Sequence, residues 1–113
     1  MSPRSVKPPK ADNFLQRARD FIRKGRFVAT YHARVRQIER IVPLPDVLFA
    51  IENGYHEKSR DRFDKAFGSW SYSFRGKTTD ERDLRVVLSF EGENELLIIT
   101  VIVLQLKILK KGK

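Results

Sequence analysis

Residues 31–54 read YHARVRQIERIVPLPDVLFAIENG, and this stretch decides the fold because its apolar spacing and its prolines define consecutive helices. Thr30, just before it, is a residue that commonly caps a helix N-terminus. Apolar side chains then recur at helical spacing at Tyr31, Val35, Ile38 and Val42. The pattern predicts a helix over residues 31–41 that buries this stripe, beside a polar stripe of His32, Arg36 and Arg40.

Prolines end this helix and begin the next. Pro43 stops the helix, and Pro45 suits the first turn of a further helix over residues 45–53. Val47, Leu48 and Ile51 form its predicted buried side. Asn53-Gly54 ends it, and after Gly54 the apolar period changes from helical to strand-like.

An amphipathic segment precedes the deciding stretch. Asp12 or Asn13 is a candidate cap for a helix over residues 13–24, and Gly25 fits the left-handed position that ends such a helix. Residues 26–30 then read as either a first short strand or an extended linker.

The C-terminal half predicts strands over residues 55–61, 69–76, 83–91 and 95–106, joined by short turns. Short connections favour antiparallel pairing. We therefore expect an α+β domain in which N-terminal helices pack on one face of a four- to five-stranded antiparallel sheet. The single domain spans residues 12–106, between a flexible basic arm (1–11) and a basic tail (107–113).

Charge is the most distinctive global property. The 113 residues include 23 Lys and Arg against 14 Asp and Glu, for a net charge of +9. The excess lies toward the two ends: residues 14–40 hold eight basic residues against two acidic ones, and residues 105–113 hold four lysines. A polarised basic surface suits a polyanion or an acidic protein. The absence of cysteine excludes disulfides, thiolate nucleophiles and Cys-based metal sites.

The deciding stretch resembles a bacterial family known only as a domain of unknown function. The likeness rests on a His-Ala pair (His32-Ala33), Arg36, Arg40 and a short helix ending in Asn53-Gly54. Phe74-Arg75-Gly76 and Ile99-Thr100-Val101 match the aromatic-x-Gly and Ile-Thr-Val elements that follow, so the resemblance covers roughly residues 27–103. Ile41-Val42 stand where that family usually has Gly-Ile.

That family looks related to the RelE-like toxins of type II toxin–antitoxin pairs, which are metal-independent ribonucleases and their relatives. The resemblance implies helices on one face of a curved antiparallel sheet, with RNA on the other face or its rim. It also implies a cognate acidic antitoxin that masks the site. The expected function is thus a cytoplasmic toxin acting as an RNA endonuclease, and the alternative is a non-catalytic basic module that binds nucleic acid or an acidic partner.

His32, Arg36 and Arg40 are the best candidates for catalysis. RNA cleavage without metal needs a base for the ribose 2′-OH, an acid for the leaving oxygen and fixed positive charge at the phosphate. An imidazole with two guanidinium groups one and two turns along the same helix supplies these groups. The alternative is structural, with a packing histidine and arginines in ion pairs to Glu39, Asp46 or Glu52.

Further candidates lie on the predicted strands. His56 is a candidate acid partner, although a lone strand histidine is more often simply half-exposed. The candidate RNA-binding residues are Arg75, Arg85, Tyr72 and Lys77. The aromatic set Trp70, Tyr72 and Phe74 is more often core than a base-stacking platform. The charged loop over residues 59–65 reads most simply as solvated.

No ligand-binding motif appears. Two histidines and scattered carboxylates lack metal-ligand spacing, and no phosphate-binding glycine loop is present, so neither metal nor cofactor is expected. The apolar run from Leu96 to Leu106 is too short to span a bilayer, and no membrane partner is expected. The expected partners are RNA and the antitoxin, and a homodimer is left open.

Overall fold

A computed structural model of the chain describes residues 8–66 and 68–104. The helices are α1 (Phe14–Arg23), α2 (Tyr31–Glu39) and α3 (Leu44–Asn53), with one 3-10 turn, η2 (Lys58–Arg60). The strands are β1 (Phe27–Ala29), β2 (Tyr55–His56), β3 (Arg62–Asp64), β4 (Ser69–Lys77), β5 (Asp83–Glu91) and β6 (Glu95–Val103). The α+β class predicted from sequence is confirmed.

The three predicted helices form within two residues of their expected bounds. The hydroxyl of Thr30 accepts a hydrogen bond from the Ala33 amide at 3.1 Å, which is the expected N-cap of α2. Gly25 has a φ of 73° and occupies the predicted left-handed position after α1. Asn13 makes no side-chain cap to α1 and itself adopts a left-handed conformation.

The sheet is mixed, with the strand order β1-β6-β5-β4-β2 and β3 also paired with β4. The prediction of a purely antiparallel sheet of four or five strands is therefore wrong. Residues 26–30 contain a strand, β1, which runs parallel to β6 and pairs Phe27 with Leu96. A parallel pair needs a long crossover connection, and the chain supplies one because all the elements from α2 to β5 lie between these two strands.

The predicted strand over residues 55–61 is interrupted. Only Tyr55 and His56 form β2, after which η2 turns the chain so that β3 also pairs with β4. Two short strands thus line one edge of β4 where the sequence predicted one longer strand. As a result, residues 58–61 lie in a turn between β2 and β3 and not along a regular strand.

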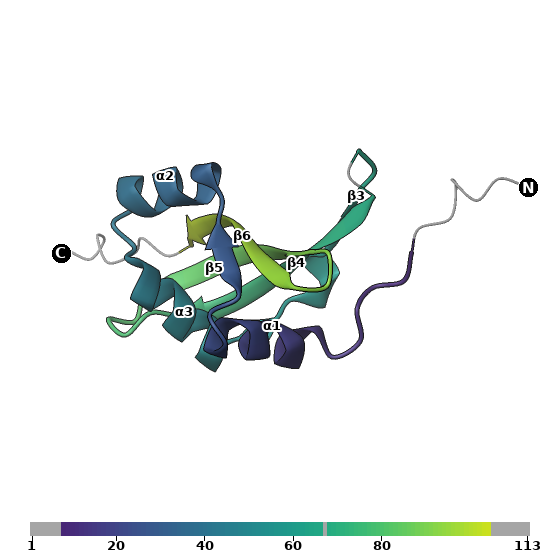
Figure 1. The fold of residues 1–113 in the computed structure, drawn as a ribbon. Coiled ribbons are helices and arrows are strands. Elements are labelled where there is room, and N and C mark those ends of the chain that lie inside the picture. Colours follow the sequence, from purple (N-terminus) through teal and green to yellow (C-terminus); the bar gives the residue numbers. More distant parts are fainter. Residues whose placement is uncertain (1–7, 67, 105–113) are drawn as a thin grey trace, which may run out of the picture.

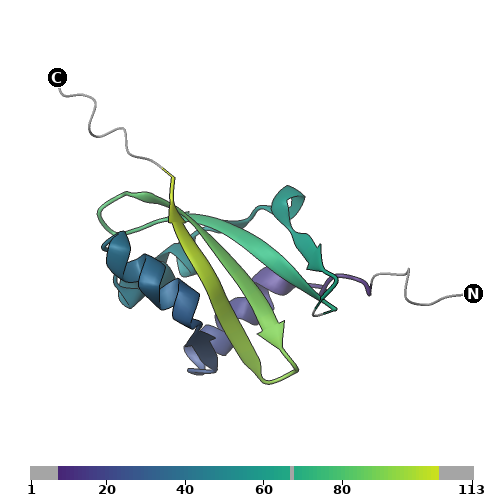
Figure 2. The same ribbon diagram turned by 90° about the horizontal axis from the view of Figure 1, so that it is seen from above.

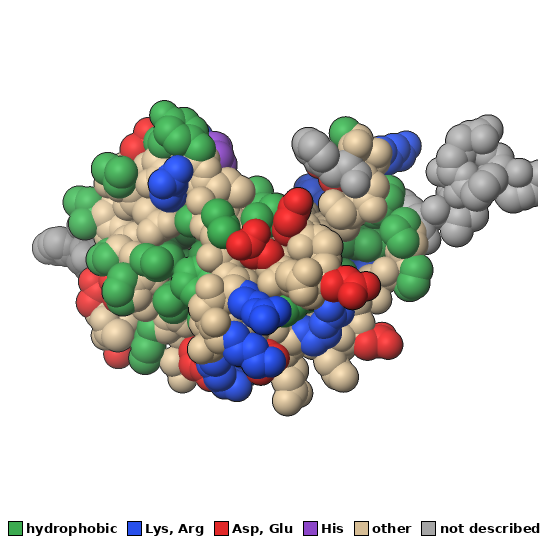
Figure 3. All heavy atoms as spheres, in the orientation of Figure 1, with side chains coloured by type: hydrophobic (Ala, Val, Ile, Leu, Met, Phe, Trp, Pro, Cys, Tyr) green, Lys and Arg blue, Asp and Glu red, His purple; other side chains and the backbone are tan. Residues whose placement is uncertain are grey.

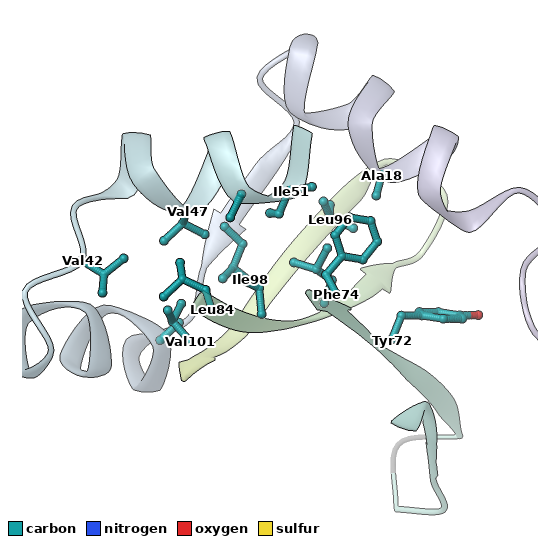
Figure 4. Close-up of a cluster of buried hydrophobic side chains, with 14 of the residues drawn as sticks. Ala18, Val42, Val47, Ile51, Tyr72, Phe74, Leu84, Leu96, Ile98 and Val101 are labelled. Carbon is teal, nitrogen blue, oxygen red and sulfur yellow. The ribbon is translucent and has the colours of Figure 1, made fainter. Parts of the chain in front are cut away.

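Helices α1 and α3 cover one face of the sheet, while α2 lies beside β6 (Figures 1 and 2). Side chains from α1 and α3 meet those of the central strands in one core: Val47 and Ile51 of α3 and Ala18 of α1 point toward the sheet (Figure 4). On the strands, the buried side chains alternate: Tyr72, Phe74, Leu84, Val86, Leu88, Leu96 and Ile98. We call the opposite face, which α1 and α3 leave uncovered, the open face.

Helix α2 is oriented differently from the prediction. Ala33 is its buried side chain, while Tyr31 and Ile38 are 77% and 78% exposed. The expectation that Tyr31 and Ile38 are buried with Val35 is wrong. Of the polar stripe, Arg40 turns toward the protein and donates to the Val101 carbonyl of β6, while His32 stays exposed.

The described part of the N-terminal arm contacts the domain. The Ala11 amide donates to the Tyr72 hydroxyl at 2.8 Å, and the Lys10 ammonium donates to Asp61 at 3.0 Å. The Trp70 indole donates to the Pro8 carbonyl at 2.7 Å. Residues 1–7 of the predicted arm and the predicted tail 107–113 lie outside the described residues. None of the helices in the described ranges has the length and apolarity that a membrane span requires.

Candidate nucleic-acid interface

A pocket opens on the open face, at the end where β3 pairs with β4. We call it the open-face pocket. Its floor consists of side chains that alternate with the core residues of β4 and β5, and its wall comes from η2 and β3. The lining residues are Ser59, Arg60, Asp61, Arg62, Ser71, Ser73, Arg85, Val87 and Ile102.

The floor carries an ion-pair network centred on Glu57. Arg85 donates to the Glu57 carboxylate at 2.8 and 3.4 Å, and Arg75 donates to it at 3.2 Å. Arg75 also makes a two-pronged contact with Asp83 at 2.9 and 2.7 Å. The hydrogen bonds from Arg85, opposed by burial, lower the pKa of Glu57, and those from Arg75 lower the pKa of Asp83. Two of the predicted RNA-binding arginines therefore already have carboxylate partners.

Two basic residues of the pocket wall differ from Arg75 and Arg85. Arg60 and Arg62 are exposed, and neither has an ion pair within the described residues. Sequence analysis missed them by treating residues 59–65 as a solvated loop. Strand alternation could not have found both, because Arg60 lies in the 3-10 turn η2 and only Arg62 lies in β3, where it pairs with Ser71 of β4.

The buried carboxylate of the pocket, Asp61, is not free to repel an anion. Its side chain is fully buried and accepts hydrogen bonds from the Ser73 amide at 3.0 Å and from Lys10. It also contacts His56 Nε2 at 2.8 Å. With this carboxylate neutralised by its partners, Arg60 and Arg62 set the electrostatic character of the wall.

The three predicted catalytic residues on α2 differ in their exposure and in their partners. His32 is exposed at the first turn, as a reacting imidazole requires. Arg36 is paired with Glu39 at 2.6 Å, which is one of the structural alternatives from sequence analysis. Arg40 donates to the Val101 carbonyl at 2.5 Å, so it joins α2 to β6.

His56 lies far from His32. Its ring packs against Phe14 and Tyr72, with centroids at 5.1 and 5.8 Å, and its side chain is 12% exposed. Because β4 and β5 lie between β2, which carries His56, and β6, against which α2 packs, the two histidines lie toward opposite edges of the sheet. The structure does not bring them together as an acid–base pair on one phosphate.

The two remaining RNA-binding candidates also lie apart from the pocket. Tyr72 is buried on the face that α1 covers, stacks on Phe14 at 4.0 Å, and its hydroxyl is held by Ala11. It does not reach the rim. Lys77 is exposed at the far end of β4, opposite Asp83.

Charge is unevenly distributed around the open face. Acidic residues Glu91, Glu93 and Glu95 lie at or beside the turn between β5 and β6, at the same end of the sheet as β3. A second hollow on this face is lined by Asp64 and Glu91 and shares Ser71 and Val87 with the open-face pocket. Figure 3 shows acidic side chains in the hollow between α2 and the β3 end, and basic side chains below them over α1. Within residues 8–66 and 68–104, no cluster of three His, Cys, Asp or Glu side chains could hold a metal ion.

Comparison with known proteins gives one match. A family model described as "Domain of unknown function (DUF4258)" matches residues 29–103, from β1 through β6. No curated protein and no solved structure matches the chain. The matched segment includes the deciding stretch, the lining of the open-face pocket and strands β2 to β6. The chain belongs to the DUF4258 family of domains of unknown function.

Proposed function

We propose that this domain binds single-stranded RNA at the open-face pocket, as the RNA-recognising toxin component of a RelE-like toxin–antitoxin pair. The observation that carries the proposal is the pair of exposed guanidinium groups, Arg60 and Arg62, on the wall of a pocket floored by serine hydroxyls. Forked guanidinium groups and hydroxyls are the side chains that proteins use for phosphate oxygens.

The surrounding network supports this role. Arg85 on the floor is held by Glu57, so its orientation is fixed before any ligand arrives. Ser71 and Ser73 lie on the same face of β4 as Arg85 on β5. The RelE-like resemblance implies RNA on a sheet face that the helices leave uncovered, and the open face is the one that α1 and α3 do not cover.

The test is binding of a fluorescent single-stranded RNA by anisotropy, in chelator and over a range of salt. Arg60→Ala/Arg62→Ala should weaken binding about tenfold or more and reduce the salt slope by up to about 2, since two phosphate contacts are lost. Lys24→Ala/Arg26→Ala is the control, because it removes the same charge beside α1. Equal losses for both double variants would show that only net charge matters and would contradict the pocket.

A second candidate function is RNA cleavage, which is favoured by the exposed imidazole of His32 at the start of α2. Arg36 lies one turn further on the same stripe, and its surface pair with Glu39 can exchange for a phosphate. The other predicted base or acid, His56, would not act on the same phosphate. In this candidate, His32 is the proton-transferring group and Arg36 the charge that stabilises the transition state.

Cleavage is tested by incubating labelled RNA with the protein in chelator, alongside His32→Ala. Loss of cleavage with retained RNA binding in His32→Ala supports catalysis. Cleavage by both proteins, or by neither, removes His32 from that role and leaves the binding module. The toxin assignment predicts that expression of the chain alone arrests growth and that an acidic protein encoded beside it relieves the arrest.

A further inference from the structure

The N-terminal arm, which precedes α1, contacts a residue of the open-face pocket. The Pro8 carbonyl accepts a hydrogen bond from the Trp70 indole, and the Lys10 ammonium lies over the same ring, 5.2 Å from its centroid. The ammonium also donates to the Asp61 carboxylate at 3.0 Å. This ion pair is partly shielded from water, because the Lys10 side chain is 38% exposed and that of Asp61 is fully buried.

The Asp61 carboxylate fills a gap in the strand pairing along one edge of β4. On this edge β2 pairs with residues 74–75 and β3 pairs with residues 69–71, so Ser73 lies between the two paired segments. The Ser73 carbonyl accepts a hydrogen bond from the Glu57 amide at 2.7 Å, and its amide donates to Asp61 at 3.0 Å. The carboxylate thus takes the place of a strand carbonyl, and it holds the turn that contains η2 against β4.

Arg60 and Arg62 flank this anchored carboxylate in the chain. The Asp61 side chain is fully buried, while both arginines are exposed on the pocket wall. Anchoring the residue between them therefore fixes the backbone that carries the two guanidinium groups. An Asp61 carboxylate without a cationic partner would also place a negative charge in the pocket lining, where it would repel a phosphate.

The two side chains that pair with Asp61 differ in charge. His56 Nε2 lies 2.8 Å from the carboxylate, and a neutral imidazole at that position supplies a hydrogen bond but no charge. Among residues 8–66 and 68–104, Lys10 is the only lysine or arginine paired with Asp61. The compensation of this buried charge therefore depends on the arm.

We propose that Lys10 is a positioning residue of the open-face pocket. From the N-terminal arm it holds Asp61, and through Asp61 it keeps Arg60 and Arg62 in place to bind phosphate. The segment that the family model matches begins at residue 29, so this cation comes from a part of the chain that precedes the family domain. Release of the arm would weaken RNA binding although both arginines remain. The effect on RNA rests on the proposed function, whereas the ordering of η2 by Lys10 does not.

Hydrogen exchange measured by NMR tests the positioning step without RNA. In Lys10→Ala, the amides of Ser73 and residues 58–62 should exchange about tenfold faster or more than in the native chain, because Asp61 loses its charged partner. Lys10→Arg should keep native exchange rates, because a guanidinium also pairs with a carboxylate. Native exchange rates in Lys10→Ala would overturn the proposal.

Anisotropy with the same single-stranded RNA measures what the positioning contributes to binding. Lys10→Ala should weaken binding about fivefold or more, and Lys10→Arg should remain within about twofold of the native chain. Lys24→Ala is the matched control, because Lys24 forms an exposed ion pair with Asp20 at 3.1 Å, and its effect should stay below about twofold. If Lys24→Ala lost as much affinity as Lys10→Ala, total charge would account for the effect and the proposal would be overturned.

A double-mutant cycle shows whether Lys10 acts through Asp61. In the Asp61→Asn background the carboxylate charge is gone, so adding Lys10→Ala should change RNA affinity by less than about twofold. An equal further loss in both backgrounds would mean that Lys10 contacts RNA directly, and it would overturn the positioning role. A native chain that binds no RNA would refute the proposed function, while hydrogen exchange would still decide whether Lys10 orders η2.

Discussion

The Arg40 guanidinium donates a hydrogen bond to the Val101 carbonyl at 2.5 Å, joining the end of α2 to β6. The bond is half-buried and links residues 61 positions apart in the chain. Arg40, which the sequence suggested as a phosphate ligand, therefore has a structural partner. A charged donor bound to a backbone carbonyl contributes more to stability than an exposed ion pair does.

Arg40→Ala should consequently lower the free energy of unfolding by about 1–3 kcal/mol. Arg34→Ala is the control, because Arg34 is exposed and makes no ion pair within the described residues, so its change should stay within about 0.5 kcal/mol. Urea denaturation followed by circular dichroism measures both. If the two variants had the same free energy of unfolding, the Arg40–Val101 hydrogen bond would make no contribution to stability.

Gly76→Ala should be among the most destabilising single changes. A Cβ built at Gly76 would lie 2.2 Å from the Ala50 carbonyl oxygen, because α3 packs directly on the backbone of β4. The two backbones cannot move apart unless the helix shifts. We therefore expect the free energy of unfolding to fall by more than about 2 kcal/mol.

Gly25→Ala provides the comparison for Gly76. An added Cβ at Gly25 meets nothing within 4 Å, so only its left-handed backbone opposes the change, at about 1 kcal/mol. In thermal denaturation, the melting temperature of Gly76→Ala should lie well below that of Gly25→Ala. The reverse order would mean that α3 does not lie against β4 as described.

The ion-pair network centred on Glu57 should make the protein less stable in acid. The folded-state pKa values of Glu57 and Asp83 are both lowered, chiefly by hydrogen bonds from Arg85 and Arg75. Carboxylates with lowered folded pKa values stabilise the protein above their unfolded pKa values, near 4, and this contribution is lost as the pH falls through the folded values.

The variant that tests this pH effect is Asp83→Asn. It should be less stable than the native chain at pH 7, because Arg75 loses the stronger of its carboxylate contacts. The difference should narrow as the pH falls toward 3. Chemical denaturation at a series of pH values measures it, and a constant difference across the series would exclude Asp83 as a source of acid sensitivity.

Asp61→Ala should be more harmful than a change of a surface carboxylate. Asp61 accepts hydrogen bonds from the Ser73 amide and Lys10 and contacts His56 while fully buried, so its loss leaves these groups without a partner. We expect Asp61→Ala to lower the free energy of unfolding by roughly 3 kcal/mol. Glu93→Ala, at the exposed β5–β6 turn, should lower it by about 0.5 kcal/mol or less. Hydrogen exchange should also show faster opening of residues 8–11, and unchanged exchange there would contradict the contact with Lys10.

The helices could be predicted from sequence because their signals are local. Thr30, Pro43 and Gly25 act on neighbouring residues through capping, missing amide hydrogens and left-handed backbone, and the structure places α2, α3 and the end of α1 accordingly. The alternation of β4 and β5 likewise appears in the sequence, since side-chain direction reverses at each strand residue.

The candidate site was less accessible to sequence analysis. Arg75 and Arg85 were recognised as basic strand residues, but their pairing with Asp83 and Glu57 depends on the register of three strands. Arg60 and Arg62 were passed over, because only the turn at η2 and the pairing of β3 with β4 place them on the pocket wall. The distance between His32 and His56 likewise follows from strand order.

The sequence by itself determined the number and order of the helices, the α+β class and the basic character of the chain. These properties follow from periodicity, caps and charge, which depend on the residues themselves and their near neighbours in the chain. Only the tertiary structure decided which basic groups are free, which side of α2 faces solvent, and that β1 joins the sheet in parallel. These properties depend on contacts between residues tens of positions apart, and packing outweighs local preference there.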